Sequence, residues 1–516
     1  MYRRIIFFTL LCLSTTTSAL AQTEASVEAM ANAASGDHNP LWLNANRYGL
    51  SSLDKTNGYL RGNIARSMDA DSARRWAWAA GLDMAVATGF TSTVVVHQAY
   101  GELRWMKGLL TIGSKEQRAE LKNQELSTGS QTLGVNARPV PSVRLSLPDY
   151  WTIPYTRGWA AIKGHLAYGI TTDGRWQEGF VSDQNRYTKN TMLHTKAGYL
   201  RLGREDKPLT VELGLEMACQ YGGTSYNVKD DLDYLLPEVD NTGGIKGALR
   251  AFVPSGAEAI EEGSDHENTN GNHLGSWLMR VNYDKPQWGV SLYADHFFED
   301  QSSMFFLDYD GYGTGENYNK KEDHRWFLYD LRDMLIGMEL RLKDCRWVNT
   351  VVGEYVYTKY QSGAVYHDHS PSLADHICGR DDYYNHIVFT GWQHWGQVMG
   401  NPLFLSPLYN DDHQLTVKDN RFWAWHLAVA GEPAEGLKYR LMATWQKGFG
   451  RYDELYADPR ENVSIMAEAA YSFPNASRLK NWYAKAAVGM DFGKLLGDNK
   501  GLQLTVGRRL KIENRK

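Results

Sequence analysis

Residues 437–446, Leu-Lys-Tyr-Arg-Leu-Met-Ala-Thr-Trp-Gln, show the pattern that decides the fold class. The odd-numbered positions carry Leu, Tyr, Leu, Ala and Trp, whereas the even-numbered positions carry Lys, Arg, Met, Thr and Gln. Successive side chains of a strand point to opposite faces, so this period of two predicts a β-strand with one apolar and one mixed face. Such a mixed face is typical of the inside of a wide barrel.

The same alternation recurs along most of the chain and predicts sixteen membrane crossings. They are expected near 57–66, 75–87, 91–104, 108–115, 157–171, 192–203, 208–221, 275–284, 287–298, 333–343, 347–359, 421–431, 436–448, 462–473, 482–492 and 501–511. Residues 116–156 and 360–420 each have room for a further hairpin. We therefore predict an all-β fold, a transmembrane antiparallel β-barrel of 16–18 strands with long outer loops.

The lengths of the connections alternate toward the C-terminus. Short connections at 204–207, 284–286, 344–345 and 432–435 separate long ones at 222–274, 299–332 and 360–420. Outer-membrane barrels have this signature, with short periplasmic turns and long outer loops. An even number of crossings places both barrel ends in the periplasm. By the same parity, 116–156 lies on the periplasmic side or in the lumen unless it contains an odd crossing.

The composition argues against other classes. Of the 516 residues, 43% are hydrophobic and 12% aromatic, a content too apolar for a disordered chain. The mean hydropathy of −0.48 disfavours a bundle of transmembrane helices. Tryptophans lie at many predicted strand ends, as in interfacial aromatic girdles: Trp76, Trp159, Trp347, Trp423, Trp445 and Trp482. The alternative is aromatic filling of a β-sandwich core.

The N-terminus predicts an exported protein. Arg3 and Arg4 precede the apolar run 5–13, and Ala-Leu-Ala at 19–21 forms a cleavage site, so residues 1–21 are interpreted as a signal peptide. The alternative is a short membrane anchor, although the run is well below the ~20 residues that span a bilayer. Residues 22–56 are expected to form a periplasmic N-terminal segment, partly helical because 24–35 are Ala-rich. The barrel would then occupy 57–516.

Charge and motifs exclude several functions. Removing residues 1–21 takes two arginines from the 55 basic residues and leaves 60 acidic ones, a net charge of −7, so no nucleic-acid partner is expected. The remaining cysteines, Cys219, Cys345 and Cys378, lie far apart and suggest neither a disulfide framework nor a metal site. The chain has no nucleophile elbow, P-loop, dinucleotide fingerprint or zinc-protease motif. We expect no metal, no cofactor and no enzymatic activity.

Residues 366–395 are dense in His, Asp, Tyr and Trp. Exposed aromatic rings stack on sugars while Asp and His bind hydroxyls, so this loop is a candidate carbohydrate site. Its candidate residues are Tyr366, His367, Asp368, Asp381, Tyr383, Tyr384 and Trp392. Two alternatives remain open, namely a polar loop that hydrogen-bonds to itself and a Zn²⁺ or Ca²⁺ site, although the spacing matches no known metal motif.

A second candidate region, residues 113–154, is rich in turns and prolines. It follows a strand directly and forms a rigid polar connection with room to fold into the pore. Lys115, Arg118 and Arg138 would then bring positive charge into the lumen, where it suits an acidic polymer. The alternative is salt bridging with Glu116, Glu120 and Glu125.

This region, together with residues 39–49, resembles the Wzi family of capsule-assembly outer-membrane proteins. The most specific elements are Gly-x-Lys-Glu at 113–116, Leu-Ser-x-Gly-Ser at 126–130 and Asn-Ala-Arg-Pro-x-Pro at 136–141. Similarity continues over most of the mature chain, through Gly158, Trp159, Lys163, Gly164, Tyr168, Gly169 and Asp173 and into 400–403. The resemblance implies an eighteen-stranded barrel occluded by its loops, a small periplasmic helical element and a lectin-like role without catalysis.

The C-terminus departs from the usual barrel pattern. Outer-membrane barrels commonly end in an aromatic residue that the assembly machinery recognises, whereas this chain ends Ile-Glu-Asn-Arg-Lys.

The leading hypothesis is a lectin-like protein in the outer membrane of a Gram-negative bacterium that attaches or organises capsular or surface polysaccharide. Its expected partners are that polysaccharide, the outer-membrane lipids and the barrel-assembly machinery. One alternative is a porin or gated channel for sugars. Another is an envelope enzyme acting on glycan or lipid.

Overall fold

The computed structural model describes most of the chain. The described residues are 23–68, 74–182, 184–229, 234–255, 270–299, 305–309, 315–320, 324–328, 332–361, 365–366, 377–378 and 381–512. The predicted signal peptide therefore lies outside them. No helix in these ranges is long and apolar enough to cross a membrane.

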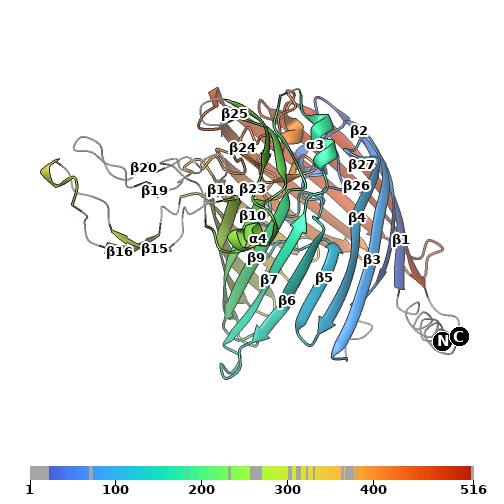
Figure 1. The fold of residues 1–516 in the computed structure, drawn as a ribbon. Helices are drawn as coiled ribbons and strands as arrows, with labels where there is room; N and C mark the ends of the chain where they lie inside the picture. Colours follow the sequence, from blue (N-terminus) through green and yellow to red (C-terminus); the bar gives the residue numbers. More distant parts are fainter. Residues whose placement is uncertain are drawn as a thin grey trace, which may run out of the picture.

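Eighteen antiparallel strands form one closed barrel (Figure 1). Its strands are β1 (Thr23–Ser35), β2 (Thr56–Arg66), β3 (Trp76–Thr88), β4 (Val94–Trp105), β5 (Gly108–Ser114), β6 (Ser142–Thr152), β7 (Ala160–Ile170), β9 (Met192–Leu202), β10 (Leu209–Tyr221), β13 (Asn272–Asp284), β14 (Trp288–Glu299), β17 (Met334–Leu342), β18 (Thr350–Tyr357), β23 (Phe422–Ala434), β24 (Leu437–Gly450), β25 (Leu455–Ser472), β26 (Trp482–Gly493) and β27 (Asn499–Ile512). Each pairs with its neighbours in sequence, and β1 pairs with β27 to close the sheet. Closure leaves no strand edge unpaired in hydrocarbon, as a membrane requires. The barrel prediction is confirmed.

The prediction of a partly helical periplasmic segment over 22–56 is wrong for its first part. Residues 24–35 lie in β1, where Glu28, Met30 and Asn32 are buried inside and the alternate alanines face outward. Alanine favours helices locally, but the thirteen backbone pairs with β27 override that preference. Residues 36–55 contact the lumen at the end of the barrel opposite to the start of β1.

The second missed strand is β6, the odd crossing within 116–156. Val143 and Leu145 face outward and are more than half exposed, while Arg144 faces the lumen. The pairing of β6 with β7 shifts register between Leu147 and Trp151. Pro148 lies in this shift, and because proline has no N–H donor, the strand bulges there. That interruption hides the alternation in the sequence.

The outer face of the barrel is apolar and carries aromatic residues at its rims. In β24, Leu441 is 48% exposed on the outside, whereas Met442, Thr444 and Gln446 are buried inside. Outward tryptophans cluster at the end where the chain makes its short turns: Trp76, Trp105, Trp151, Trp159, Trp288, Trp347 and Trp482. Trp423, Trp425 and Trp445 lie outward near the other end. These positions match an interfacial girdle.

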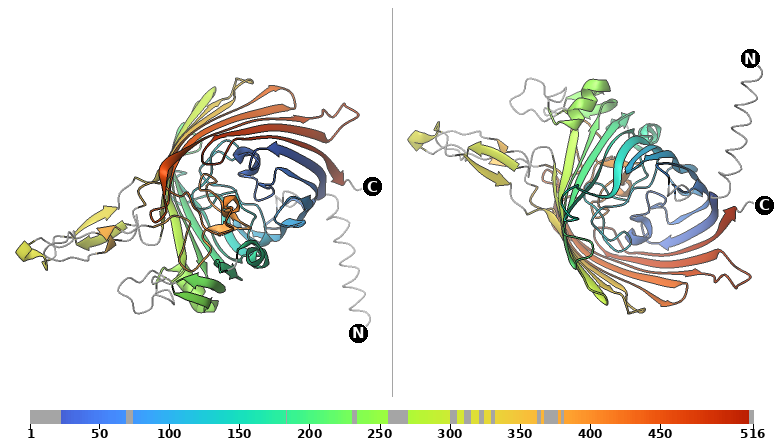
Figure 2. Two further views of the ribbon diagram at one scale, coloured as in Figure 1. Left: turned by 90° about the horizontal axis from the view of Figure 1, so that it is seen from above. Right: turned by 90° about the horizontal axis from the view of Figure 1, so that it is seen from below.

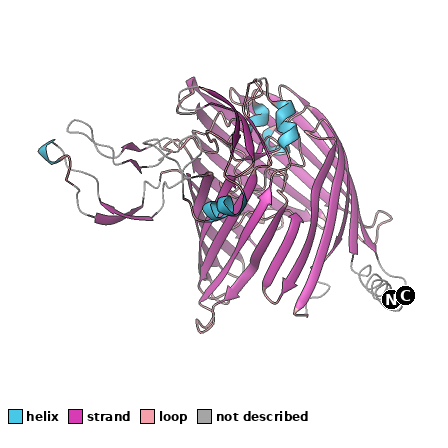
Figure 3. Cartoon of the chain, in the orientation of Figure 1, coloured by secondary structure: helices cyan, strands magenta, loops and turns pink. Residues whose placement is uncertain are grey.

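Long loops emerge at one end of the barrel, and their helices are short (Figure 3). Their elements are α2 (Leu41–Asn44), α3 (Gly174–Phe180), β8 (Tyr187–Lys189), β11 (Thr224–Lys229), β12 (Leu235–Asp240), α4 (Gly244–Phe252), β15 (Phe305–Tyr309), η2 (Gly315–Asn317), β16 (His324–Leu328), β19 (Val365–Tyr366), β20 (Ile377–Cys378), β21 (Gln393–His394), β22 (Gln397–Val398) and η3 (Pro407–Tyr409). By the convention of outer-membrane barrels, this end is the outer one.

Three connections fold back into the barrel, as the views along its axis show (Figure 2). We call residues 36–55, 115–141 and 381–421 together the plug. Large plug side chains such as Trp42, Leu126, Tyr384 and Phe404 are fully buried and form one hydrophobic cluster with wall residues such as Phe297.

The polar inner face of the barrel pairs with the plug. The Trp42 indole donates to Thr444 Oγ1 at 3.0 Å. Lys122 lies 2.7 Å from Asp295, and both are buried. The Thr128 amide donates to Glu354 at 2.7 Å. Buried polar groups need such partners, so the inward-facing polar residues hold the plug in place.

Candidate functional site

A pocket opens among the loops at the outer end of the barrel. Its volume is about 230 Å³, and we call it the outer pocket. Aromatic side chains from three separate connections meet here, namely Phe90, Trp176 and Phe180, and Trp395. Trp176 stacks on Phe180 at 4.8 Å, and its ring lies 6.1 Å from that of Trp395 at an interplanar angle of 37°. The two tryptophans thus form two walls of one cavity.

Trp395 occupies an unusual backbone position. It forms, with Gly396, the two-residue turn between β21 and β22, and both residues have positive φ, 55° and 74°. This turn type favours Asn or Gly, because positive φ strains a bulky side chain. A Cβ on residue 396 would lie 2.5 Å from the Trp176 ring. The turn therefore presents Trp395 to the pocket at the expense of local strain, a feature associated with functional sites.

Arg138 carries the positive charge of the outer pocket. Its guanidinium donates to Thr91 Oγ1 at 2.7 Å and Ser92 Oγ at 2.9 Å, and it lies 4.4 Å from the Trp395 ring centre. Burial lowers the pKa of Arg138 to about 10, which keeps it protonated at neutral pH. Its hydrogen-bond partners are neutral hydroxyls, so the buried charge is not neutralised by direct contact with an acid.

A hydrogen-bond network fixes the position of Trp395. The backbone N–H of Trp395 donates to Asp173 at 2.8 Å, and its indole N–H donates to Thr172 at 3.3 Å. The next side chain, His394, bonds through Nδ1 to the Arg138 carbonyl at 2.9 Å and through Nε2 to the Thr172 amide at 3.2 Å. This pattern requires a neutral ring with the proton on Nδ1. Burial lowers the pKa of His394, which favours that neutral form.

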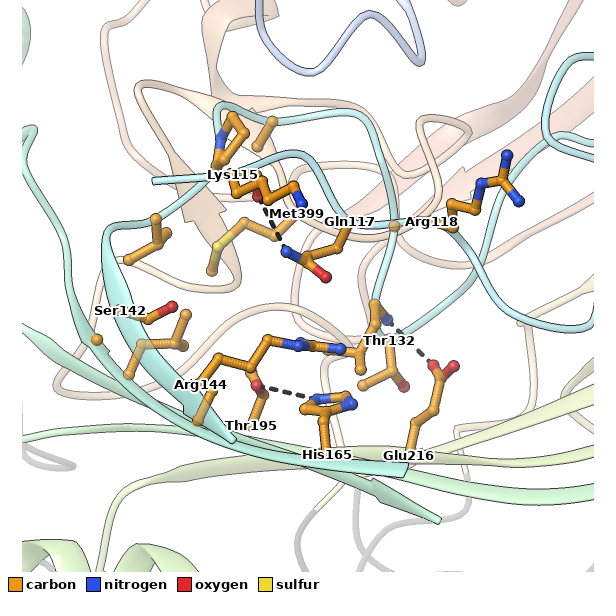
Figure 4. Close-up of a pocket in the computed structure, with 18 of the residues that line it drawn as sticks. Lys115, Gln117, Arg118, Thr132, Ser142, Arg144, His165, Thr195, Glu216 and Met399 are labelled. Atoms are coloured by element: carbon orange, nitrogen blue, oxygen red, sulfur yellow. Dashed lines mark hydrogen bonds between the residues drawn. The ribbon is translucent and has the colours of Figure 1, made fainter. Parts of the chain in front are cut away.

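A second cavity of about 140 Å³ lies inside the barrel between the plug and β5–β10 (Figure 4). We call it the lumenal cavity, and Arg138 lines both cavities. Arg144 extends across it beside His165. Within the described part of the chain, the Arg144 guanidinium has no hydrogen-bond or ion-pair partner. Glu216 of β10 lies on the same side of the cavity, beyond His165, and accepts from the Leu133 amide at 3.3 Å.

The structure places the three predicted cations in different settings. Lys115 is paired with Glu102 of β4 at 2.7 Å and lies 4.7 Å from the Tyr100 ring. Arg118 is exposed and extends away from the other labelled side chains in Figure 4. Only Arg138 contributes to both cavities.

The acids near these cations bind the barrel wall. Glu116 lies 2.6 Å from His97, and Glu120 lies 2.5 Å from Lys163. The salt bridges are therefore made with wall strands rather than within the segment itself.

The predicted aromatic surface of residues 366–395 is buried instead. Tyr383 and Tyr384 are 0% exposed and Trp392 is 1% exposed. The Tyr383 hydroxyl donates to Asp333 at 2.9 Å, and the Trp392 indole donates to the Thr132 carbonyl at 2.9 Å. These three side chains hold the plug together and offer no face to a polymer, so the expectation that they are exposed is wrong.

The other predicted residues of this loop lie elsewhere. The backbone of Tyr366 pairs with Ile377 between β19 and β20. His367 and Asp368 lie outside the described residues. Asp381 is partly buried where the plug begins. Among the described residues, no group of three or more His, Cys, Asp or Glu side chains is arranged to hold a metal ion.

Sequence reasoning missed the aromatic residues that line the outer pocket. Trp176 lies in a loop that the alternation marks only as a connection, and Trp395 stands three positions from Trp392 with no local feature to separate them. One weak signal exists, the glycine at 396 directly after Trp395, because Gly at such a turn suggests a tight hairpin.

Comparison with known proteins supports the fold. No family model matches the chain, and no curated protein matches its sequence. Among solved structures, it is similar to Wzi of Escherichia coli, described as an outer-membrane protein involved in group 1 capsule assembly and a carbohydrate-binding β-barrel. The identity is 13%, the alignment covers 97% of this chain and 87% of that one, and the TM-score is 0.56.

Two further solved structures, OccK3 (OpdO) of Pseudomonas aeruginosa and OccD1 (OprD), align more loosely. OccK3 (OpdO) gives 11% identity and a TM-score of 0.44 over 96% of this chain and 97% of its own. OccD1 (OprD) gives 7% identity and a TM-score of 0.43 over 96% of this chain and 98% of its own. With eighteen strands closed into one sheet, the chain has the fold of an outer-membrane barrel like Wzi.

Proposed function

We propose that this protein is a non-catalytic, lectin-like barrel in the outer membrane of a Gram-negative bacterium that holds an acidic capsular or surface polysaccharide. The observation that carries the proposal is the outer pocket, which is lined by two tryptophan rings and by a buried arginine that bonds to no acid among the described residues. Residues 1–21 would act as its export signal. Its partners would be the polysaccharide, the outer-membrane lipids and, during insertion, the barrel-assembly machinery.

The shape of the outer pocket suits a sugar. Indole rings provide flat apolar faces, and the remaining wall is polar, with Ser51, Ser52, Thr91 and Gln397 available to sugar hydroxyls. Binding sites for small polar ligands typically combine apolar walls with a few directed polar groups. Asp54, which is exposed, adds a carboxylate acceptor.

The charge of the pocket favours an acidic sugar. A carboxylate on the ligand would gain a charge-assisted bond to Arg138 in a partly desolvated site, where such bonds are stronger than in water. In the lumenal cavity, Arg144 offers a second cation that has no hydrogen-bond partner among the described residues. Two such arginines suit a polyanion better than a neutral glycan.

The plug favours a holding role over a channel. Trp42, Tyr384 and Phe404 are packed into the lumen beside wall residues, so passage of a sugar would require the plug to move. Planar-bilayer recordings distinguish the two functions, since a holding protein should give no large stable openings. Stable wild-type openings would favour the porin alternative.

The binding test compares two exposed-ring substitutions. Trp395→Ala removes one pocket wall, whereas the matched control Trp425→Ala removes a tryptophan from the outer wall that is 60% exposed. We expect Trp395→Ala to weaken binding of the cell's own polysaccharide by about 30-fold, the size of an ordinary hot-spot residue. Equal binding by both variants in calorimetry would contradict the assignment of the pocket.

A deletion strain tests the cellular role. Cells without the protein should synthesise polysaccharide but release it into the medium, and wild-type protein should restore retention. Normal surface polysaccharide in the deletion strain would refute the holding role. Turnover of glycan or phospholipid by the purified protein would favour an enzyme instead.

A further inference from the structure

The helix α4 packs on the outside of the barrel rather than over its mouth (Figures 1 and 2). It contacts the outward side chains at the outer ends of β7, β9 and β10. The Tyr168 hydroxyl donates to the Ala248 carbonyl at 3.2 Å, and the His194 ring lies 5.8 Å from Phe252. Tyr221, which also points outward, is buried beneath the helix with Ala251. The helix is thus attached to the wall that faces the membrane.

Small residues let the helix approach closely. Gly247 and Ala251 are buried. A Cβ on Gly247 would lie 2.9 Å from the Tyr221 ring, so a larger residue would push the helix off the wall.

The opposite face of α4 is apolar and uncovered. Ile245 is 82% exposed, Leu249 64%, Phe252 42% and the following Val253 59%. Their spacing of four, three and one residues places them on one side of a helix. A contiguous exposed stripe of this kind is typical of a helix that lies in a membrane interface.

A basic edge borders the apolar stripe. Lys246 and Arg250 lie four positions apart and share one flank, and α4 contains no acidic residue. Lys196 of β9 adds a third cation, bonded to the Phe252 carbonyl and 4.8 Å from the Phe252 ring. The helix therefore presents apolar and cationic surfaces side by side.

A groove runs along the outer wall next to Lys196. Its volume is about 760 Å³, and outward side chains line it, including Ile162, Leu200, Leu213, Trp277 and Met279. Gly198, two positions after Lys196 on the same face of β9, has open space where a side chain would stand. The missing side chain deepens a channel that continues the apolar belt of the barrel.

We infer that α4 and this groove form a binding site for a phosphorylated lipid of the outer leaflet, the lipid A part of lipopolysaccharide. An acyl chain lies in the groove, the apolar stripe of α4 enters the bilayer interface, and Lys246, Arg250 and Lys196 bind the phosphates. Charge complementarity and continuity with the lipid-facing belt both point to this occupant. The site is separate from the outer pocket and does not depend on the proposed polysaccharide function.

The experiment measures binding of lipid A to the purified full-length barrel, with phosphatidylcholine as the neutral probe. Each basic residue near an anionic lipid surface contributes about 1 kcal/mol, so Lys246→Gln/Arg250→Gln should weaken lipid A binding by roughly 30-fold. The matched control Lys207→Gln/Lys343→Gln removes two cations at the other end of the barrel and should leave binding unchanged. Retention of the heat-dependent gel shift verifies that each variant folds.

Further variants separate the parts of the site. Lys246→Arg/Arg250→Lys keeps both charges and should bind like wild type, whereas Gly198→Leu should fill the groove and displace the lipid. Equal affinity for lipid A and phosphatidylcholine would overturn the headgroup assignment. Unchanged lipid A binding in Lys246→Gln/Arg250→Gln, or an equal loss in the control, would overturn the site.

Discussion

The buried ion pair between Lys122 and Asp295 is expected to keep the plug closed. Lys122 belongs to the plug and Asp295 to the wall strand β14, they lie 2.7 Å apart, and their side chains are 1% and 0% exposed. Lys122→Met would leave the carboxylate buried, with the Gln131 amide at 3.0 Å as its one remaining donor among the described residues. The substitution thus leaves one unpaired charge buried at the interface between plug and wall.

The size of the effect follows from this burial. Breaking a buried pair by removing one partner costs about 3–5 kcal/mol, because an uncompensated charge remains. At 1.4 kcal/mol per factor of ten, the detached state of the plug should become roughly 100- to 4,000-fold more populated. The exposed pair Lys447–Glu461, with a contact distance of 2.8 Å, should contribute far less, because solvent screens it.

Two measurements check this expectation. In planar bilayers, Lys122→Met should give openings that wild type lacks, and limited proteolysis should cleave the plug faster. Lys447→Met should behave like wild type. Lys122→Met/Asp295→Asn, which removes both charges and keeps an acceptor for Gln131, should restore much of the closure. Wild-type behaviour of Lys122→Met, or no recovery in the double variant, would refute the reasoning.

Three further predictions concern the plug and the outer pocket. Burial, and after it the charge of Arg186, lowers the pKa of His386 to about 3, below its unfolded value near 6.5. The stability that the neutral ring contributes is therefore complete above pH 6.5 and is lost as the pH falls toward 3. Proteolysis of the plug should accelerate at pH 5, and this acceleration should be smaller in His386→Asn. Trp392→Phe should lower plug stability by about 1–3 kcal/mol, through an unsatisfied buried acceptor, and leave polysaccharide affinity unchanged if the plug stays closed; a selective loss of affinity in calorimetry would restore Trp392 as a ligand. Gly396→Ala should displace Trp176, 2.5 Å from the new Cβ, and weaken binding in the same assay, whereas unchanged affinity would argue against the Trp176 wall.

The sequence predicted sixteen of the eighteen strands because their alternation is a local property. Each residue in those strands faces lipid or lumen according to its position, so apolar and polar side chains alternate along the strand. The two missed strands lack a clear alternation of apolar and polar residues. In β1 the outward residues are mostly alanines, and in β6 Pro148 and a register shift interrupt the pattern.

The candidate site was less predictable, since residue type does not reveal which way a loop folds. The aromatic cluster of 366–395 suggested an exposed surface, but Tyr383, Tyr384 and Trp392 turn inward. Arg138 was identified from charge alone, and the structure adds its contact with Trp395 and its position on both cavities.

The sequence by itself determined an antiparallel membrane barrel with short turns at one end and long loops at the other, because strand periodicity and connection length depend on neighbours along the chain. Only the tertiary structure decided how the barrel closes, which loops fill it and which aromatic rings stay accessible. Those outcomes depend on contacts between residues hundreds of positions apart, such as Thr23 with Ile512 and Trp392 with Thr132. Such pairs leave no periodic signal, so a single sequence contains no pattern from which to predict them.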